Sequence, residues 1–84
     1  MNYWVYVLEN ENGRWYIGQT NNLDIRISKH NNQFVRSTKN RGLWKLIFKE
    51  NFKTRSEAMK REEYLKSGAG RKLLKDLLDG RAPW

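Results

Sequence analysis

The chain has 84 residues, which is enough for one domain and too short for a second independent core. It has no cysteine and a single histidine, which excludes disulfides, thiol catalysis and a Cys/His cluster for zinc. Lys and Arg number 17 against 9 Asp and Glu, so the net charge is +8. This excess is typical of nucleic-acid-binding domains, because each neutralised phosphate releases condensed counterions.

The positive charge is also compatible with a role in solubility alone and with attraction to an acidic membrane surface. A membrane surface is disfavoured, because neither long helix expected below pairs a bulky apolar face with a continuous basic face. No apolar run approaches the roughly 20 residues of a membrane span. The first four residues lack the basic-then-apolar pattern of a secretion signal. We therefore expect a cytoplasmic protein that binds nucleic acid and no membrane.

The first 20 residues predict a β-hairpin. Residues 3–9 (Y-W-V-Y-V-L-E) are rich in aromatic and β-branched types, and residues 14–20 (R-W-Y-I-G-Q-T) have the same character. The segment between them, residues 10–13 (N-E-N-G), is a turn sequence.

The length of this turn decides how Tyr6 and Tyr16 point, because side chains alternate between the two faces of a strand. A two-residue turn at 12–13 places the tyrosines on opposite faces. A three-residue loop at 11–13, with its glycine left-handed in a bulge, places Tyr6 opposite Gly18 and both tyrosines on one face. The local sequence leaves both loops open.

The remaining pattern predicts helices and one more strand. Asn21 or Asn22 can cap the first helix, and Thr54 with Glu57 forms a capping box at the start of the second. The elements expected in chain order are a helix over 23–30, an exposed basic loop over 31–42, a strand over 43–50, a helix over 54–66 and a short helix over 71–78. The order ββαβαα predicts one α+β domain over residues 1–84, with a small three-stranded antiparallel sheet flanked by helices.

Helix geometry distinguishes one carboxylate. At about 100° per residue, the second long helix has an apolar stripe made by Ala58, Met59 and Leu65. Glu62 falls within this stripe, whereas the two other acids of the helix point to solvent. A buried carboxylate needs a compensating cation or hydrogen-bond donors. Glu62 is therefore a candidate metal ligand or catalytic acid, and a structural salt bridge to a buried arginine is the alternative.

The first helix carries a second candidate pair. Arg26 and His30 are four residues apart, so they stack on one edge of the buried stripe of that helix. A lone histidine at the border of a core is commonly a packing residue. Beside a sheet that bears two tyrosines, however, the pair suits phosphate chemistry, because arginine can bind a phosphate with two nitrogens and histidine can move a proton.

Several further features do not indicate a binding site. Strand tyrosines are ordinarily packing residues, and Trp44 is expected in the core rather than stacked on a base. No Gly-x4-Gly-Lys-Ser/Thr motif is present, which excludes a P-loop nucleotide site. The segment 68–70 (G-A-G) is expected to stop a helix rather than to hold a phosphate.

These residues resemble the motifs of the GIY-YIG endonuclease family. The first motif of the family appears as Trp4-Val5-Tyr6 and the second as Tyr16-Ile17-Gly18. Further landmarks follow in the family's order and extend over almost the whole chain: Gln19-Thr20, Leu23 to Arg26, His30, Thr38 to Arg41, Leu43 to Leu46, and Ser56 to Lys66 through Glu62. The resemblance is to the short, stand-alone bacterial members.

Three positions depart from the family pattern. Trp4 stands where the first motif has glycine, and Gln19 stands where some relatives carry lysine. The stretch 73–76 (L-L-K-D) offers no counterpart of an asparagine found near the C-terminus of several active relatives. The family's tyrosines share one active-site surface, so the resemblance favours the three-residue loop of the hairpin.

The resemblance implies an endonuclease that hydrolyses phosphodiester bonds in nucleic acid, DNA rather than RNA. In this hypothesis Glu62 binds one Mg²⁺ or Mn²⁺ ion, and no small-molecule cofactor takes part. Tyr6, supported by Tyr16, removes a proton from the attacking water. Arg26, His30 and the metal lower the pKa of this tyrosine by stabilising its phenolate. Arg26 also steadies the phosphate, and His30 moves protons.

These five side chains are expected to surround one common hollow. Further contacts to nucleic acid are predicted at Gly18, Arg36, Lys39, Arg41, Lys66, Arg71 and Lys72. So small a protein surface favours low sequence specificity. The alternatives are a catalytically degenerate nucleic-acid-binding module on the same scaffold and a structural partner of another protein.

Overall fold

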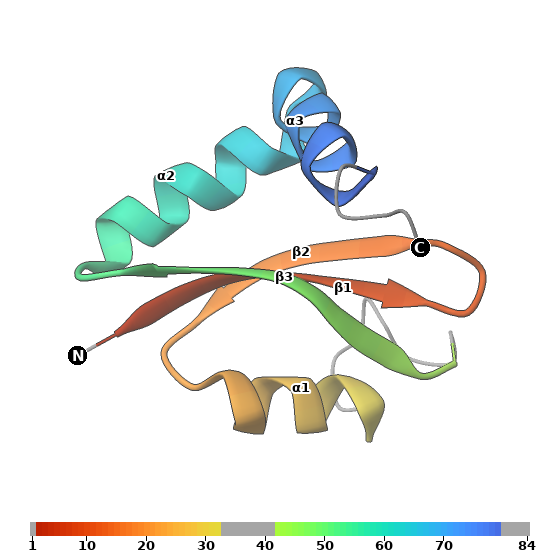
Figure 1. Ribbon diagram of the computed structural model, residues 1–84. Coiled ribbons are helices and arrows are strands. Elements are labelled where there is room, and N and C mark those ends of the chain that lie inside the picture. Colours follow the sequence, from red (N-terminus) through yellow and green to blue (C-terminus); the bar gives the residue numbers. More distant parts are fainter. Residues whose placement is uncertain (1, 33–41, 80–84) are drawn as a thin grey trace.

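The computed structural model describes residues 2–32 and 42–79. Six elements follow one another in the predicted order ββαβαα (Figure 1). They are β1 (Tyr3–Asn10), β2 (Trp15–Thr20), α1 (Leu23–Asn31), β3 (Trp44–Phe52), α2 (Arg55–Lys66) and α3 (Gly68–Asp79). The predicted nucleic-acid contacts Arg36, Lys39 and Arg41 lie outside the described residues.

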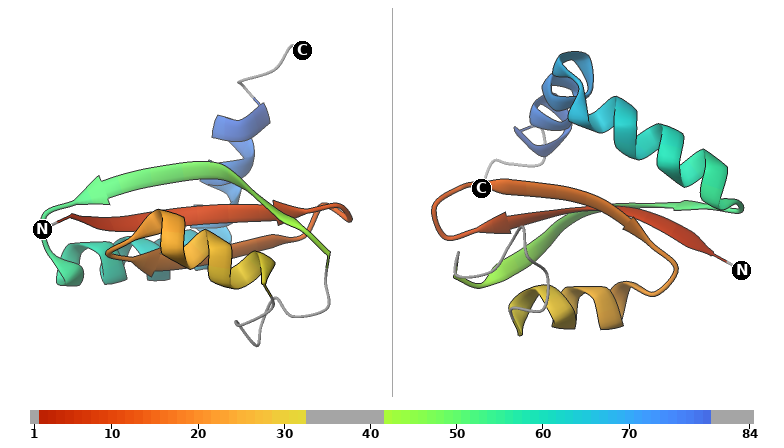
Figure 2. Two further views of the ribbon diagram at one scale, coloured as in Figure 1. Left: turned by 90° about the horizontal axis from the view of Figure 1, so that it is seen from below. Right: turned by 180° about the vertical axis from the view of Figure 1, so that it is seen from behind.

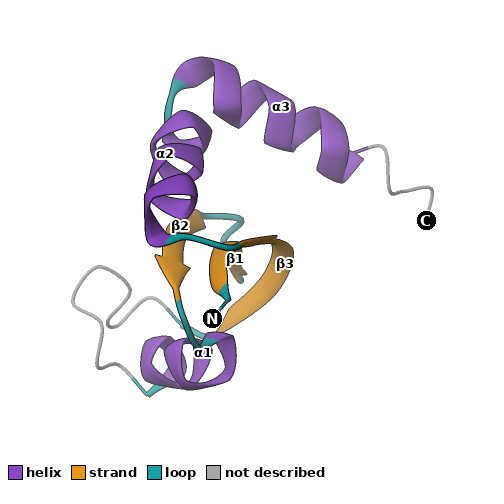
Figure 3. Cartoon of the chain, turned by 90° about the vertical axis from the view of Figure 1, so that its left-hand side faces the viewer, coloured by secondary structure: helices purple, strands orange, loops and turns teal. Residues whose placement is uncertain are grey.

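The three strands form one antiparallel sheet, as predicted. Their spatial order is β2-β1-β3, with β1 in the centre. Helix α1 lies on one face of this sheet, and α2 and α3 lie on the other (Figures 1 and 2). Figure 3 shows the same three layers from the side, with the strands between α1 and α2. The central strand is therefore covered on both faces, which explains why its sequence is almost continuously apolar.

Alternation along β1 divides the interior into two cores. Val5 and Val7 pack towards α2 and α3, together with Ala58, Leu65 and Leu74. The intervening residues belong to the second core, under α1, whose buried members are Tyr6, Leu8 and Trp44. Trp44 is thus a core residue, as expected. Successive side chains of one strand consequently serve two different surfaces of the molecule.

The hairpin has the three-residue loop. The side chain of Asn10 accepts hydrogen bonds from the backbone N–H of Asn12 at 3.0 Å and of Arg14 at 2.9 Å. The backbone N–H of Gly13 donates to the carbonyl of Asn10 at 3.0 Å, and Gly13 has a φ of 79°. Only glycine adopts this left-handed conformation without strain, so the loop sequence fixes the geometry of the bulge.

This loop sets the register of the two strands. Tyr6 pairs with Gly18, and Leu8 pairs with Tyr16. The prediction that both tyrosines share one face of the sheet is therefore confirmed, and that face is the one covered by α1.

The helix caps agree with the sequence. The side chain of Asn22 accepts from the backbone N–H of Ile25 and caps α1. Thr54 and Glu57 form both hydrogen bonds of the predicted capping box at the start of α2. Helices α2 and α3 have 12 residues each, and no helix within 2–32 and 42–79 has the length and apolar character needed to span a bilayer.

One boundary differs clearly from the prediction, because α3 begins at Gly68 rather than at residue 71. Ser67 caps it: its hydroxyl accepts from the backbone N–H of Gly70, and its carbonyl accepts from that of Arg71. The glycine-rich segment is the first turn of a helix and not a loop. A Cβ at Gly70 would overlap the carbonyl oxygen of Tyr64, so glycine is required where α3 meets α2.

Gly70→Ala is expected to lower the free energy of unfolding by at least about 2 kcal/mol, because the added methyl group would lie 2.5 Å from the Cα of Leu65. Urea unfolding monitored by tryptophan fluorescence measures this loss. Gly68→Ala is the matched control, since nothing lies within 4 Å of its Cβ position. The control should leave stability unchanged or raise it by about 0.5 kcal/mol. Equal stability of the two variants would contradict the packing of α3 on α2.

Candidate active site

Tyr6 is the centre of a polar cluster under α1. It extends from the central strand, and its side chain is fully buried. The phenolic oxygen lies 3.0 Å from Nε2 of His30 and accepts a hydrogen bond from Nε of Arg26 at 3.1 Å. Both predicted residues of α1 therefore contact the first predicted tyrosine directly.

The spacing of Arg26 and His30 explains this arrangement. One helical turn separates them, so both point from α1 towards the sheet. His30 is buried, with 1% of its surface exposed, whereas Arg26 is half-buried. Asn31, which was not among the predicted site residues, fixes the end of this helix. Its side chain accepts from the backbone N–H of Trp44 at 2.7 Å and donates to the carbonyl of the same residue at 3.2 Å.

Tyr16 completes the cluster from the edge strand. Its ring centroid lies 4.6 Å from that of His30 in an edge-on contact, 6.2 Å from that of Tyr6 and 6.5 Å from that of Trp44. Tyr16 is only half-buried, in contrast to Tyr6. The two phenols thus differ in their access to solvent although they are neighbours on one face.

Gly18 has no side chain, and the tyrosine rings occupy the space that a side chain would fill. A Cβ at this position would lie 2.6 Å from the hydroxyl oxygen of Tyr6 and 3.0 Å from Cε1 of Tyr16. Gly18 is buried beneath these rings. Its burial does not agree with the predicted contact to nucleic acid. In this structure Gly18 makes room for the two tyrosines. The sequence feature that indicates this role is the pairing of a glycine with a tyrosine in the hairpin register.

Burial dominates the ionisation of Tyr6. Removal from water raises the pKa of Tyr6 to about 12, although the hydrogen bond from Arg26 acts in the opposite direction. The negative charge of Glu62 adds to the increase in the pKa of Tyr6. The expected lowering of this pKa is therefore wrong for the protein without a bound ion, because desolvation outweighs the effect of the guanidinium.

His30 is neutral at pH 7. Burial, together with the positive charge of Arg26, lowers the pKa of His30 to about 4. Arg26 can only donate to the oxygen of Tyr6. The Tyr6 proton is thus able to point at Nε2 of His30, which accepts it when the imidazole carries its own proton on Nδ1.

Glu62 is the least exposed acid of α2, as its position on the helix predicted. Its side chain is 20% exposed and forms an ion pair at 2.8 Å with Lys66, one turn later. The predicted alternative, a buried arginine partner, is not what the structure has. Glu57 is engaged in the capping box and Glu63 is exposed.

The helices that carry the predicted residues lie on opposite faces of the sheet, α1 with Arg26 and His30 and α2 with Glu62 (Figure 3). The tyrosines, Arg26 and His30 form one packed cluster. Glu62 belongs to the other layer, yet its carboxylate is near enough to raise the pKa of Tyr6. A hollow shared by all five side chains stays a prediction.

The described side chains offer few ligands for a metal ion. Among residues 2–32 and 42–79, no group of three or more acidic or histidine side chains is placed to hold a metal ion. Glu62 offers one carboxylate, which is only partly exposed. One carboxylate is sufficient for Mg²⁺, which keeps several waters and takes further oxygens from a phosphate. The residues therefore fit a weakly held ion that is shared with a substrate.

The predicted basic contacts are scattered over α2 and α3. Lys66 is exposed and paired with Glu62. Arg71 and Lys72 are exposed in the first half of α3, on the face of the sheet away from Tyr6. None of the three touches the tyrosine cluster in the interactions that the structure records.

Comparison with known proteins gives consistent results. The family model of the GIY-YIG catalytic domain matches residues 2–74. A UPF0213 protein of Staphylococcus saprophyticus is 37% identical over 79 residues, which are 93% of this chain and 96% of that protein. The UPF0213 protein YazA of Bacillus subtilis is 41% identical over 66 residues, 77% of this chain and 67% of that protein. The solution NMR structure of a UPF0213 protein from Bacillus halodurans is similar, with a TM-score of 0.57 and 36% identity over 92% of this chain and 85% of that one.

The sole histidine of the chain provides a direct test of the buried cluster. The NMR signal of the His30 ring should titrate with a midpoint near pH 4 instead of 6.5. The unfolded chain binds this proton near pH 6.5 and the folded chain only near pH 4, so stability should fall as the pH is lowered between these values. The expected loss between pH 7.5 and 5 is about 2 kcal/mol. His30→Gln should remove that loss, and a midpoint at 6 or above would contradict the burial.

Proposed function

The chain belongs to the GIY-YIG nuclease family, and on this premise we propose that it is a metal-dependent endonuclease that hydrolyses phosphodiester bonds. The observation that carries the proposal is the cluster of Tyr6, Tyr16, Arg26 and His30, with Glu62 close enough to influence Tyr6. Phosphodiester hydrolysis needs a group to accept a proton, a cation for the phosphate and a ligand for a metal ion. The cluster and Glu62 provide one candidate for each requirement.

Arg26 is the candidate phosphate ligand. Its Nε is used by Tyr6, which orients the guanidinium plane. The guanidinium has two further nitrogens that can bind two phosphate oxygens together, and Tyr16 is a second hydrogen-bond partner of this side chain. Arg26 is half-buried, so the interaction would be less screened by water than at an open surface.

Tyr16 is favoured over Tyr6 as the proton acceptor. Tyr6 is fully buried, its oxygen is engaged by two side chains, and its pKa is raised to about 12. A base must reach the attacking water, and half-buried Tyr16 has the better access. The sequence analysis favoured Tyr6 as the residue that removes the proton, and we now favour Tyr16. Tyr6 then acts by orienting Arg26 and His30.

His30 is suited to moving a proton within the cluster. It is neutral, so one ring nitrogen is available as an acceptor. Its ring contacts Tyr16 edge-on, and its Nε2 is bonded to Tyr6. The imidazole therefore connects the buried phenol with the accessible one.

Glu62 would hold one Mg²⁺ or Mn²⁺ ion together with water and a phosphate oxygen. When bound, such an ion supplies Lewis-acid stabilisation of the charge that develops on the leaving oxygen. Lys66 forms an ion pair with this carboxylate in the structure, and a partly exposed ion pair of this kind contributes little stability. Lys66 can therefore exchange its carboxylate partner for a phosphate.

The substrate proposed is DNA rather than RNA, bound with low sequence specificity. The net charge of +8 on 84 residues supports contacts to the phosphate backbone of either nucleic acid, and the choice of DNA rests on the resemblance to the family. A small domain of this kind has room for few base-edge contacts, and these supply most sequence discrimination.

A nucleic-acid-binding module that does not cleave is the second candidate. It is favoured by the raised pKa of Tyr6 and by the ion pair that occupies Glu62. The two candidates differ in whether labelled DNA is nicked in the presence of Mg²⁺ or only retarded on a gel.

Glu62→Gln is expected to reduce cleavage at least about 100-fold while DNA affinity changes less than about twofold, since only the metal ligand is lost. Nicking of labelled DNA with Mg²⁺ or Mn²⁺ and a binding assay with Ca²⁺ measure the two quantities. Glu63→Gln is the control, because it makes the same charge change on the adjacent, exposed residue. Cleavage by Glu62→Gln at the rate of the control would exclude this role.

Tyr16→Phe should lower kcat by at least about 100-fold with a small change in KM, because the hydroxyl acts in the chemical step. Tyr64→Phe makes the same change on exposed α2 and should leave both constants unaltered. Steady-state kinetics on one oligonucleotide compare the variants. An active Tyr16→Phe enzyme would remove Tyr16 from the mechanism.

A further inference from the structure

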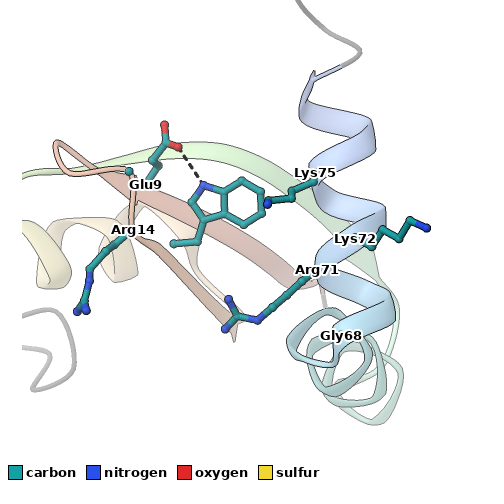
Figure 4. Close-up of a pocket in the computed structure, with 8 residues that line it drawn as sticks. Glu9, Arg14, Gly68, Arg71, Lys72 and Lys75 are labelled. Carbon is teal, nitrogen blue, oxygen red and sulfur yellow. Dashed lines mark hydrogen bonds between the residues drawn. The ribbon is translucent and has the colours of Figure 1, made fainter.

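A concave surface lies between the β1–β2 hairpin and α3 (Figure 4). It encloses about 890 Å³, and we call it the basic hollow. Its side chains come from the hairpin and from α3: Glu9, Arg14, Trp15, Arg71, Lys72 and Lys75. The sequence identified two of these residues as separate candidates but did not reveal the hollow, because the loop and the helix are more than 50 positions apart.

The basic hollow is separate from the tyrosine cluster. Trp15 and Tyr16 are successive residues of β2, so their side chains point to opposite faces of the sheet. Trp15 packs against the core under α2 and α3, whereas Tyr16 packs against the core under α1. The sheet therefore lies between the two surfaces.

The hollow concentrates positive charge. Arg14, Arg71, Lys72 and Lys75 line it, and none of them forms an ion pair with any residue of 2–32 or 42–79. The one acid in the lining, Glu9, accepts the indole N–H of Trp15 at 2.9 Å. In Figure 4, Arg71 and Lys75 extend from α3 towards the hairpin, whereas the charged ends of Arg14 and Lys72 extend away from the space between them. Arg71 and Lys75 are therefore the two cations that would stabilise a polyanion bound in the hollow.

Trp15 adds a flat aromatic surface among these cations. The bond to Glu9 fixes the orientation of the indole, and one part of the ring packs on the core. Trp15 is one of the residues that line the hollow, and in Figure 4 Lys75 extends from α3 towards the hairpin. Arg71 extends from the same helix towards the strand end, with Nε donating weakly to the carbonyl of Lys66 at 3.4 Å. Its terminal nitrogens are directed away from that bond.

A fixed aromatic plane with cations on its rim matches the chemistry of a nucleotide with an unpaired base. The base can stack on the indole, and the flanking phosphates can bind the arginine and lysine side chains. A base within a duplex is already stacked on both sides and cannot insert in this way. The size of the hollow, about 890 Å³, is sufficient for one nucleotide.

We propose that the basic hollow binds a single-stranded segment of the nucleic-acid substrate by stacking one unpaired base on Trp15. The inference rests on the proposed function only in taking nucleic acid as the substrate. It adds a second binding subsite on the face of the sheet opposite the tyrosine cluster, and it commits the protein to a preference for unpaired strands.

The first test compares two double variants that remove the same charge. Arg71→Gln/Lys75→Gln alters the hollow, and Lys53→Gln/Lys60→Gln alters two exposed residues outside it. Fluorescence anisotropy with a labelled oligothymidylate should show about tenfold weaker binding for the first variant than for the second. For the Arg71→Gln/Lys75→Gln variant, the slope of the logarithm of the association constant against the logarithm of salt concentration should be smaller in magnitude by about 1.4, if two phosphate contacts are lost. A blunt duplex should bind the two variants equally.

Two outcomes would overturn the proposal. One is equal weakening of single-strand binding by both double variants, and the other is the same tenfold difference for the duplex. An independent readout is the indole N–H resonance of Trp15, which should shift when oligothymidylate is added to the wild-type protein. An unchanged resonance at saturation would exclude stacking on this ring.

Kinetics separate this proposal from the proposed nuclease function. Arg71→Gln/Lys75→Gln should raise KM for a single-stranded substrate and leave kcat within about twofold, because the lining of the hollow includes none of the side chains proposed for the chemical step. Glu62→Gln should have the opposite pattern, with lost cleavage and retained single-strand binding. If the wild-type protein does not cleave at all, the anisotropy and NMR tests still decide whether the hollow binds a strand.

Discussion

The hydroxyl of Tyr6 lies against the backbone of Gly18, and the organisation of the candidate site depends on this contact. A side chain at position 18 would lie 2.6 Å from the phenolic oxygen. The contact exists because the three-residue loop pairs Tyr6 with Gly18, and a loop one residue shorter would turn Tyr16 to the other face. With the phenol in this position, Arg26 and His30 of α1 bond to one oxygen from two directions. A small change in the hairpin therefore affects every member of the cluster.

Burial of the cluster has an electrostatic consequence. Desolvation raises the pKa of Tyr6 and lowers the pKa of His30, so both groups remain neutral at pH 7 and only Arg26 carries a charge among the residues that bond to Tyr6. One lasting cation at the centre of a neutral, partly dry cluster is suited to an anionic ligand such as a phosphate. Glu62 stays in the other layer, where partial exposure and Lys66 stabilise its charge. The carboxylate of Glu62 is still near enough to raise the pKa of Tyr6.

The sequence predicted those features that depend on local geometry. Helical periodicity identified Glu62 as the inward acid of α2 and placed Arg26 and His30 on one edge of α1. The capping box at Thr54 and the element order were also correct. The hairpin loop needed the family resemblance, because two registers were equally compatible with the local residues. All these predictions concern contacts between near neighbours or pairs that one strand register fixes.

Features that depend on distant packing were not predictable in this way. The increase in the pKa of Tyr6 requires that α1 cover the face of β1 that bears this side chain, which periodicity within the strand does not reveal. The early start of α3 depends on the close approach at Gly70, and the contact of Asn31 with Trp44 joins two elements across a long loop. The basic hollow likewise combines the hairpin with a helix at the other end of the chain. In each case the partner lies far away in the sequence.

The most direct test is the rate of metal-dependent DNA cleavage by Gly18→Ala, measured at a temperature where its unfolding curve shows a native protein. The added methyl group must displace the Tyr6 hydroxyl and, with it, the bonds to Arg26 and His30. We expect a rate at least about tenfold below that of the wild type, together with a His30 midpoint that moves from about 4 towards 6.5. Cleavage at the wild-type rate by a folded Gly18→Ala protein would contradict the assembly of the site around this contact.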